Sequence, residues 1–155
     1  MSRRLRETIS DWLMALAAPV LFVALFLPWS HQFSGAFLAR WGDTSALRGV
    51  PRDPTAWQVY SAADVLLALI AAGLLAVSLW GGRARRLALA IALVVALAFT
   101  AHALAAPPTN GAVVFDAAAG TYAPNDPSAG VGEYLALVAL ALGAGGVAFA
   151  FTADP

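Results

Sequence analysis

The sequence predicts an all-α membrane protein, a bundle of four transmembrane helices with two extracytoplasmic loops. Apolar residues make up 61% of the 155 residues and charged residues only 12%, whereas a soluble domain carries roughly 25% charged residues. A globule of this size cannot hide so much apolar surface, because its surface-to-volume ratio is unfavourable. The apolar residues also gather into four runs of about 17–25 residues, the length that crosses hydrocarbon as a helix. The chain is short enough to be a single domain, residues 1–155.

Each of the four runs is expected to be a helix, because hydrocarbon cannot satisfy exposed backbone groups. Their apolar residues are continuous rather than alternating, which argues against a membrane barrel. The basic segment SRRLRE before the first run also resembles the start of a secretory signal. That run is longer than the 7–15 apolar residues usual in a signal, which favours an uncleaved span. The predicted spans are 12–29, 62–80, 87–106 and 131–151, and the predicted outer loops are 30–61 and 107–130.

The arginines predict the orientation of the spans. One group precedes the first span, and a second joins the second and third spans. Loop 30–61 has three arginines spread over some thirty residues, and loop 107–130 has no basic residue. The positive-inside rule then places both termini in the cytoplasm and both long loops outside a plasma (inner) membrane. The first group is Arg3, Arg4 and Arg6, and the second is Arg83, Arg85 and Arg86.

Aromatic residues lie at the ends of the predicted spans. The residues at the inner boundary are Trp12, Trp80 and Phe151, and those at the outer one are Trp29, Trp57, Tyr60 and Tyr134. Amphipathic rings of this kind form belts where hydrocarbon meets headgroups. We therefore expect these side chains to face the membrane interface.

Small residues recur every fourth position on three of the spans. Lipid tails are as apolar as leucine, so close packing through small residues is what joins membrane helices. We expect these faces to pack inside the chain, or to form the contact of a homo-oligomer or a protein partner. The series are Ala68, Ala72 and Ala76; Ala88, Ala92 and Ala96; Ala139 and Gly143; Gly146 and Ala150.

The two outer loops show signs of local structure. AFLARW at 36–41 has the pattern of a short amphipathic helix lying on the membrane surface. Residues 113–115 and 121–123 are predicted to be short strands around a turn that ends in Gly120. Loops of this length are usually functional or disordered, so this outer region is a predicted contact surface.

Three polar residues near the outer ends of the spans are the candidates for function. Asp64 closes the sequence SAAD, which has the form of a capping box, and Glu133 holds a similar place before the fourth span. Capping explains both acids without any function, but ionisable residues in a span often mark functional pathways. His102 lies near the outer end of the third span, where it either joins helices through a polar contact or binds a proton or metal.

Several kinds of chemistry lack support in the sequence. There is no cysteine, no HExxH, no nucleotide loop and no nucleophile elbow, so we predict no metal, no cofactor and no enzyme activity. The net charge of zero gives no indication of nucleic-acid binding. The deep parts of the spans hold no charged residue, although ion-coupled carriers usually need one.

The sequences FLPWS, TAWQVYSAADVLLAL and GEYLALVALALGAGG carry a resemblance to a family. In layout the chain resembles uncharacterised small four-span integral membrane proteins of actinobacterial type. The resemblance covers most of the chain and implies the four-span layout, but no particular activity. The residues that carry it are Pro28, Trp29, Trp57, Asp64, Gly132 and Tyr134.

The sequence thus leaves two main functions open, and a third, an enzyme acting on lipid headgroups, would need Asp64, His102 and Glu133 to converge within hydrogen-bond reach. The first is a non-enzymatic membrane protein that acts by binding, as an accessory subunit or scaffold of a membrane assembly, in contact with membrane lipid. The alternative is a small transporter, channel or lipid-binding protein with an outer vestibule near Asp64, His102 and Glu133.

Overall fold

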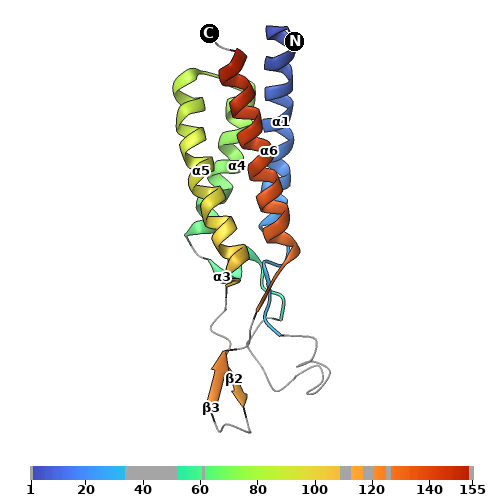
Figure 1. The fold of residues 1–155 in the computed structure, drawn as a ribbon, viewed down its shortest axis with the longest axis vertical. Coiled ribbons are helices and arrows are strands. Elements are labelled where there is room, and N and C mark those ends of the chain that lie inside the picture. The colour runs from blue at the N-terminus through green and yellow to red at the C-terminus, as the bar shows by residue number, and fades with distance from the viewer. Residues whose placement is uncertain are drawn as a thin grey trace.

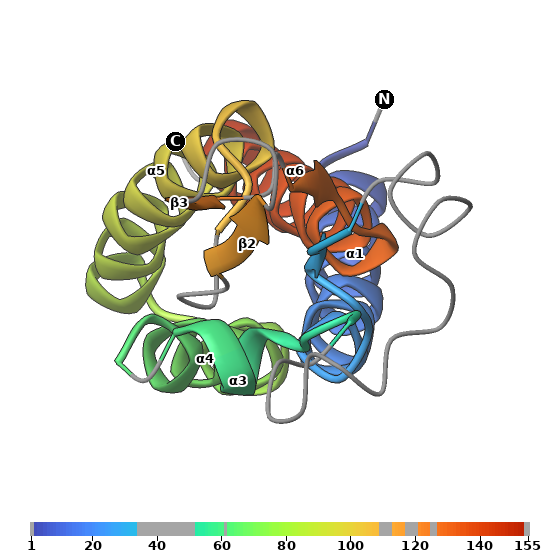
Figure 2. The ribbon, with the colours of Figure 1, turned by 90° about the horizontal axis from the view of Figure 1, so that it is seen from below.

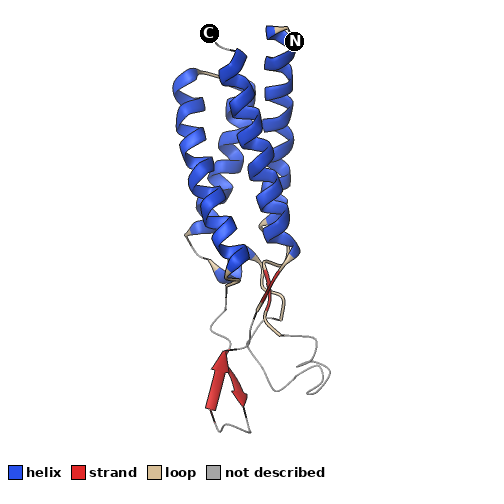
Figure 3. Cartoon of the chain, viewed as in Figure 1, coloured by secondary structure: helices blue, strands red, loops and turns tan. Residues whose placement is uncertain are grey.

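Four long helices make up most of the chain. The structure is a computed structural model, which describes residues 2–33, 52–60, 62–108, 113–116, 121–124 and 127–153. Each of the four helices is long and apolar enough to cross a membrane, as the sequence predicts. They lie side by side, and a small hairpin of strands lies beyond one end (Figures 1 and 3). The helices are α1 (Arg3–Ala24), α4 (Ala63–Trp80), α5 (Arg83–Ala105) and α6 (Val131–Ala153).

The bounds of α4, α5 and α6 lie close to those predicted, but α1 differs at both ends. It begins nine residues before the predicted residue 12, because the Ser2 hydroxyl caps it by accepting from the amide of Leu5 at 3.3 Å. It ends at Ala24, although the apolar run continues to Trp29. The chain turns there, so that Trp29 Nε1 donates to the carbonyl of Ala24 at 2.8 Å. The length of an apolar run therefore does not by itself show at which residue the helix ends.

That turn also corrects the prediction for two of the outer aromatic residues. Trp29 is fully buried rather than exposed at the interface, and Tyr60 is only partly exposed. Trp12, Trp80 and Tyr134, in contrast, are exposed as expected. The buried indole is consistent with its hydrogen bond, since a buried N–H needs an acceptor.

Viewed along the long axis, the helices follow the order α1, α4, α5, α6 around the molecule (Figure 2). α1 packs most extensively against α6, whereas α4 and α5 make the weakest contact of the four neighbouring pairs. α4 and α5 are joined by Gly81 and Gly82, both with positive φ (57° and 105°). This link lies at the same end as both termini, opposite the strands (Figure 1).

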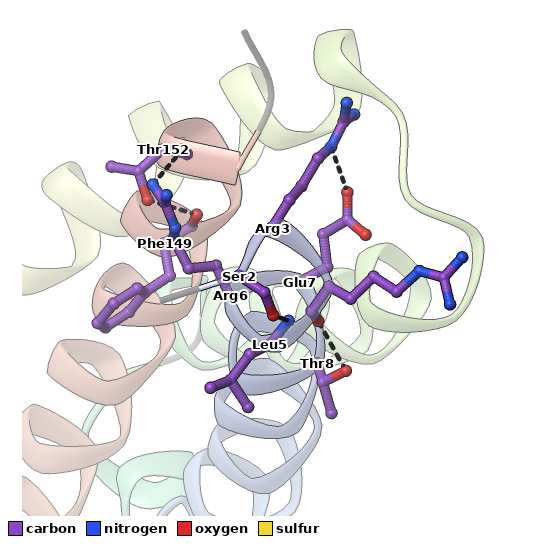
Figure 4. A network of polar contacts seen from close by, with 9 residues as sticks. Ser2, Arg3, Leu5, Arg6, Glu7, Thr8, Phe149 and Thr152 are labelled. Carbon is purple, nitrogen blue, oxygen red and sulfur yellow. Dashed lines mark hydrogen bonds and ion pairs between the residues drawn. The ribbon is translucent and has the colours of Figure 1, made fainter.

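A polar network joins the ends of α1 and α6 (Figure 4). The guanidinium of Arg6 donates to the carbonyl of Thr152 at 2.9 Å. The last carbonyls of a helix lack partners within it, so a cation there is favourable. Arg3 pairs with Glu7 one turn along at 3.1 Å, on the exposed face of α1.

The small residues of α6 pack as the sequence predicts. Ala139, Gly143, Gly146 and Ala150 are all buried. A Cβ added at Gly146 would lie 2.9 Å from Met14 Cγ and 3.0 Å from the carbonyl oxygen of Ser10. The Ser10 hydroxyl donates to the carbonyl of Gly146 at 2.8 Å, so only glycine allows this approach of α1 to α6.

The alanine series of α4 and α5 do not form the core in the same way. Ala72 and Ala88 are exposed, and of the six alanines only Ala96 is buried. The buried positions of these two helices are held mostly by larger side chains instead. The buried positions of α4 are Asp64, Leu67, Ala71, Leu74 and Val77.

Backbone hydrogen bonds join the segments that lie next to the ends of the long helices. The sequence did not predict this pairing. β1 (Ser30–His31), which follows α1, pairs antiparallel with β4 (Ser128–Ala129), which precedes α6. The amide of Trp29 donates to the carbonyl of Pro54 at 2.9 Å. That carbonyl precedes the short helix α3 (Ala56–Val59), so three distant segments meet at one end of the four helices.

The predicted strands in the second loop are present. β2 (Val113–Asp116) pairs antiparallel with β3 (Thr121–Pro124), and Val114 lies opposite Ala123. The turn predicted to end in Gly120 and the surface helix predicted at 36–41 lie outside the described residues.

Candidate functional site

Two acidic side chains are enclosed where the helices meet the strands. Asp64 lies in the first turn of α4 and Glu133 in the first turn of α6. Both are fully buried. None of their four carboxylate oxygens has a hydrogen-bond partner among the residues that the structure describes. A buried polar group without a partner is costly and marks a position that packing alone does not explain.

The predicted capping role of Asp64 is wrong. The N-cap of α4 is Ala62, which forms no side-chain cap. Asp64 is therefore the second helical residue, one position before the one from which an acid reaches back to the N-cap amide. Its side chain shares the inward face of α4 with Leu67 and Ala71, and Ser61 lies outside the described residues.

Tyr60 lies beside this acidic pair. Its ring contacts the edges or faces of Trp29 and Phe99, with centroids 5.9 and 5.1 Å away. Burial, followed by the charges of Glu133 and Asp64, raises the pKa of Tyr60 to about 12. Both carboxyl groups therefore lie close enough to Tyr60 to affect the pKa of its phenol, although they belong to the first turns of different helices.

Thr100 adds a third buried polar group, next to Phe99 on α5. It is fully buried, and its hydroxyl has no hydrogen-bond partner in the described part of the chain. A helical threonine usually donates to a carbonyl of its own helix. This hydroxyl was not among the residues predicted for the site, and its only signal in the sequence is a polar residue in an apolar run.

His102 is placed differently from the two acids. Its side chain is exposed, whereas Asp64 and Glu133 are enclosed. Across the residues described, no three histidine, aspartate or glutamate side chains form a group that could hold a metal ion. The structure thus brings Asp64 and Glu133 to the same end of the interior, with His102 on an outward surface.

A second feature is a partly open groove of about 720 Å³ between α4 and α5. It extends from Ala63 and Phe99, next to the acidic pair, to Val77 and Arg85 near the glycine link. Its rim includes exposed leucines and valine, so it opens toward the surroundings of the helices. Its other lining residues include Leu66, Leu69, Gly73, Ala76, Ala88, Ala92, Val95 and Ala96.

Small side chains on both helices leave this groove open. Ala92 and Ala96 of α5 lie along it, opposite Gly73 and Ala76 of α4. The alanine faces of α4 and α5 were predicted to pack closely, but these two helices make the weakest contact of the four neighbouring pairs. Facing small residues therefore predict a close approach or a gap, and only the positions of the helices decide between the two.

Among the residues that the structure describes, Arg85 is the one charged residue that lines the groove. It lies in the first turn of α5, is exposed, and has no ion pair or hydrogen bond within the described ranges. The rest of the lining is apolar apart from backbone atoms. The groove thus combines an apolar channel with one cation at the end near the termini.

Comparison with protein-family models, with curated proteins and with solved structures gives no match to this chain. The acidic pair and the groove are therefore the features of the molecule that point to a function.

Proposed function

We propose that the chain is a multi-pass protein of the plasma membrane, a four-helix transmembrane bundle with both termini and the α4–α5 link in the cytoplasm. The four apolar helices support the spans. The arginines support the orientation, because Arg3, Arg4 and Arg6 lie at the same end as Arg83, Arg85 and Arg86.

Within that membrane, the protein acts by binding rather than by catalysis, and its ligand is the acyl chain of a lipid held between α4 and α5. The observation that carries this proposal is the apolar groove of about 720 Å³. Sites that hold small ligands are usually about 300–1,000 Å³ and mostly apolar. In a bilayer such a groove opens sideways into hydrocarbon, so an acyl chain reaches it without leaving the membrane.

The size of the groove favours an acyl chain over a partner's helix. Ala63 and Val77 lie fourteen residues apart on α4, which at 1.5 Å per residue is about 21 Å. A partner's helix would bring side chains to a width of about 10 Å along this whole length. A flexible chain of methylene groups is narrow enough to follow the groove along its length.

An accessory-subunit or scaffold role has less support from the geometry. The small-residue face of α6 is already covered by α1, through the contact of Gly146 with Ser10 and Met14. That face is therefore not available to a partner. The outer strands remain as a contact surface for such a role.

Filling the groove tests the proposed function. Ala92→Phe places a ring in the groove, and Ala98→Phe places the same ring on an exposed face of α5 outside it. The variants are reconstituted in bilayers of one phospholipid, extracted in mild detergent, and examined for retained lipid by native mass spectrometry. We expect Ala92→Phe to lose most of the retained lipid and Ala98→Phe to keep it. Equal retention in both variants would contradict acyl-chain binding.

A second function, movement of a proton or cation, has one specific observation in its favour. Asp64 and Glu133 are enclosed without hydrogen-bond partners in the structure's described ranges, and intramembrane acids often belong to ion pathways. Proton and cation flux into liposomes is measured for the parent protein, for Asp64→Asn, and for Asp53→Asn as an exposed control. This function requires flux that Asp64→Asn removes and Asp53→Asn retains.

A further inference from the structure

We propose that the groove between α4 and α5 selects lipids with an anionic headgroup, and that Arg85 is the residue that holds the headgroup phosphate. This inference rests on the proposed binding of an acyl chain in the same groove. It adds the chemical class of the ligand and the end of the groove at which its headgroup lies.

The position of Arg85 supports this selection. It is the one cation among the groove-lining residues, and it lies at the end of the groove near both termini. Hydrocarbon ends at about this level, because the apolar part of α5 begins at Leu87, immediately after Arg86. A lipid whose tail follows the groove therefore presents its phosphate beside the guanidinium, which binds phosphate oxygens through two N–H groups.

The backbone at this end adds to the attraction. Gly82, the N-cap of α5, has no side chain to cap the helix. The first amides of a helix have no partners within it and carry a partial positive charge. Anions bind at such helix starts. The amides and Arg85 thus act on the same end of the groove, where no described side chain is paired with Arg85.

A general effect of surface charge makes a different prediction. Any arginine close to the membrane attracts anionic lipids, wherever its side chain lies. Arg83 provides the comparison, because it is an exposed arginine in the same turn of α5 but does not line the groove. General attraction predicts equal effects of replacing Arg83 and Arg85. A specific phosphate site in the groove predicts that only the replacement of Arg85 changes the headgroup preference.

The test measures headgroup preference in the full-length protein. The parent protein, Arg85→Gln, Arg85→Lys and Arg83→Gln are reconstituted in bilayers of phosphatidylglycerol and phosphatidylcholine with identical acyl chains. The ratio of the two lipids retained is then read by native mass spectrometry. We expect Arg85→Gln to lower the preference for phosphatidylglycerol by about fivefold, the factor that one cation contributes at a membrane surface. Arg83→Gln should keep most of the preference, and Arg85→Lys, which keeps the charge but not the paired N–H groups, should keep only part of it.

The outcomes separate this inference from the proposed function. Equal losses in Arg85→Gln and Arg83→Gln, or no preference in the parent protein, overturn the anionic site. If phosphatidylcholine is still retained and is lost in Ala92→Phe, acyl-chain binding stands without headgroup selection. If Ala92→Phe retains both lipids, the proposed function itself fails.

Discussion

At the scale of single residues, Asp64 and Glu133 are the positions that the fold does not explain. Each lies in the first turn of an apolar helix, where an exposed acid would favour the positive end of the helix dipole. Here both are enclosed, and within the described residues neither forms the hydrogen bonds that would offset the loss of water. Natural proteins often keep such costly groups because of a function.

We expect Glu133→Gln to leave the free energy of unfolding unchanged or to raise it by about 1 kcal/mol. The amide keeps the shape of the side chain and brings no charge into the interior. The measurement is unfolding in mixed detergent micelles, with Glu7→Gln as the control. Glu7 belongs to an exposed pair with Arg3, and such pairs contribute about 0.3–0.5 kcal/mol. A loss above about 2 kcal/mol in Glu133→Gln would mean that the carboxylate has a strong partner.

Tyr60 gives a prediction about pH. Its pKa is raised to about 12 by burial and by the two nearby acids, whereas an unfolded tyrosine titrates near 10. The unfolded chain therefore loses this proton first, and the stability that the neutral phenol provides is complete below pH 10 and is lost between about pH 10 and 12. Tyrosinate absorbance should show one late-titrating group, which Tyr60→Phe removes. Titration of every tyrosine near pH 10 would contradict the enclosed position of the ring.

At the scale of elements, the contact of α1 with α6 sets how closely the helices approach. Its centre is Gly146, where an added Cβ meets Met14 Cγ at 2.9 Å and the Ser10 carbonyl at 3.0 Å. Gly145, one residue earlier, has no neighbouring atom within 4 Å of an added Cβ. The two glycines thus differ in packing, although they share a helix and a local sequence.

We expect Gly146→Ala to lower the free energy of unfolding by about 1–3 kcal/mol, as overpacking usually does. Gly145→Ala should leave stability unchanged or raise it by up to about 1 kcal/mol, because alanine favours a helix. Thermal unfolding in detergent compares the two variants directly. If both have the same effect, the α1–α6 contact is not the close one that the structure shows.

The elements also show which parts of the fold the sequence could predict. The bounds of α4, α5 and α6 follow from long apolar runs, and the strands β2 and β3 from local patterns. The end of α1 at Ala24 did not follow, because the residues after it are equally apolar and only the hydrogen bond of Trp29 Nε1 to Ala24 marks the turn. Asp64 was predicted as a candidate, but its enclosure depends on where α4 begins, one residue after Ala62.

For a similar reason, the sequence could not predict the groove between α4 and α5. Ala92 and Ala96 were recognised as a small-residue face, but a small face allows either contact or a gap. The choice depends on how the four helices are placed relative to one another, and here α4 and α5 make the weakest contact of the neighbouring pairs. Arg85 belongs to the site because of its place at the end of that gap.

At the scale of the whole molecule, the two ends of the helices have different roles. One end holds both termini and the α4–α5 link, with the arginines and the contact of Arg6 with Thr152. The other end joins the segments after α1, before α3 and before α6 through backbone hydrogen bonds. The proposed headgroup site at Arg85 lies at the first end, the acidic pair lies at the second, and the groove extends between them.

The most direct test of a four-span membrane protein is the labelling of single cysteines in intact cells. The chain has no cysteine of its own, so each introduced thiol reports one position. Exposed positions at the two ends are Ser2 and Ala84 at one end, and Asp53 and Ser128 at the other. We predict that an impermeant maleimide labels Asp53→Cys and Ser128→Cys from outside, and labels Ser2→Cys and Ala84→Cys only after the membrane is opened. Labelling of Ala84→Cys from outside while Ser2→Cys stays protected would contradict the four spans.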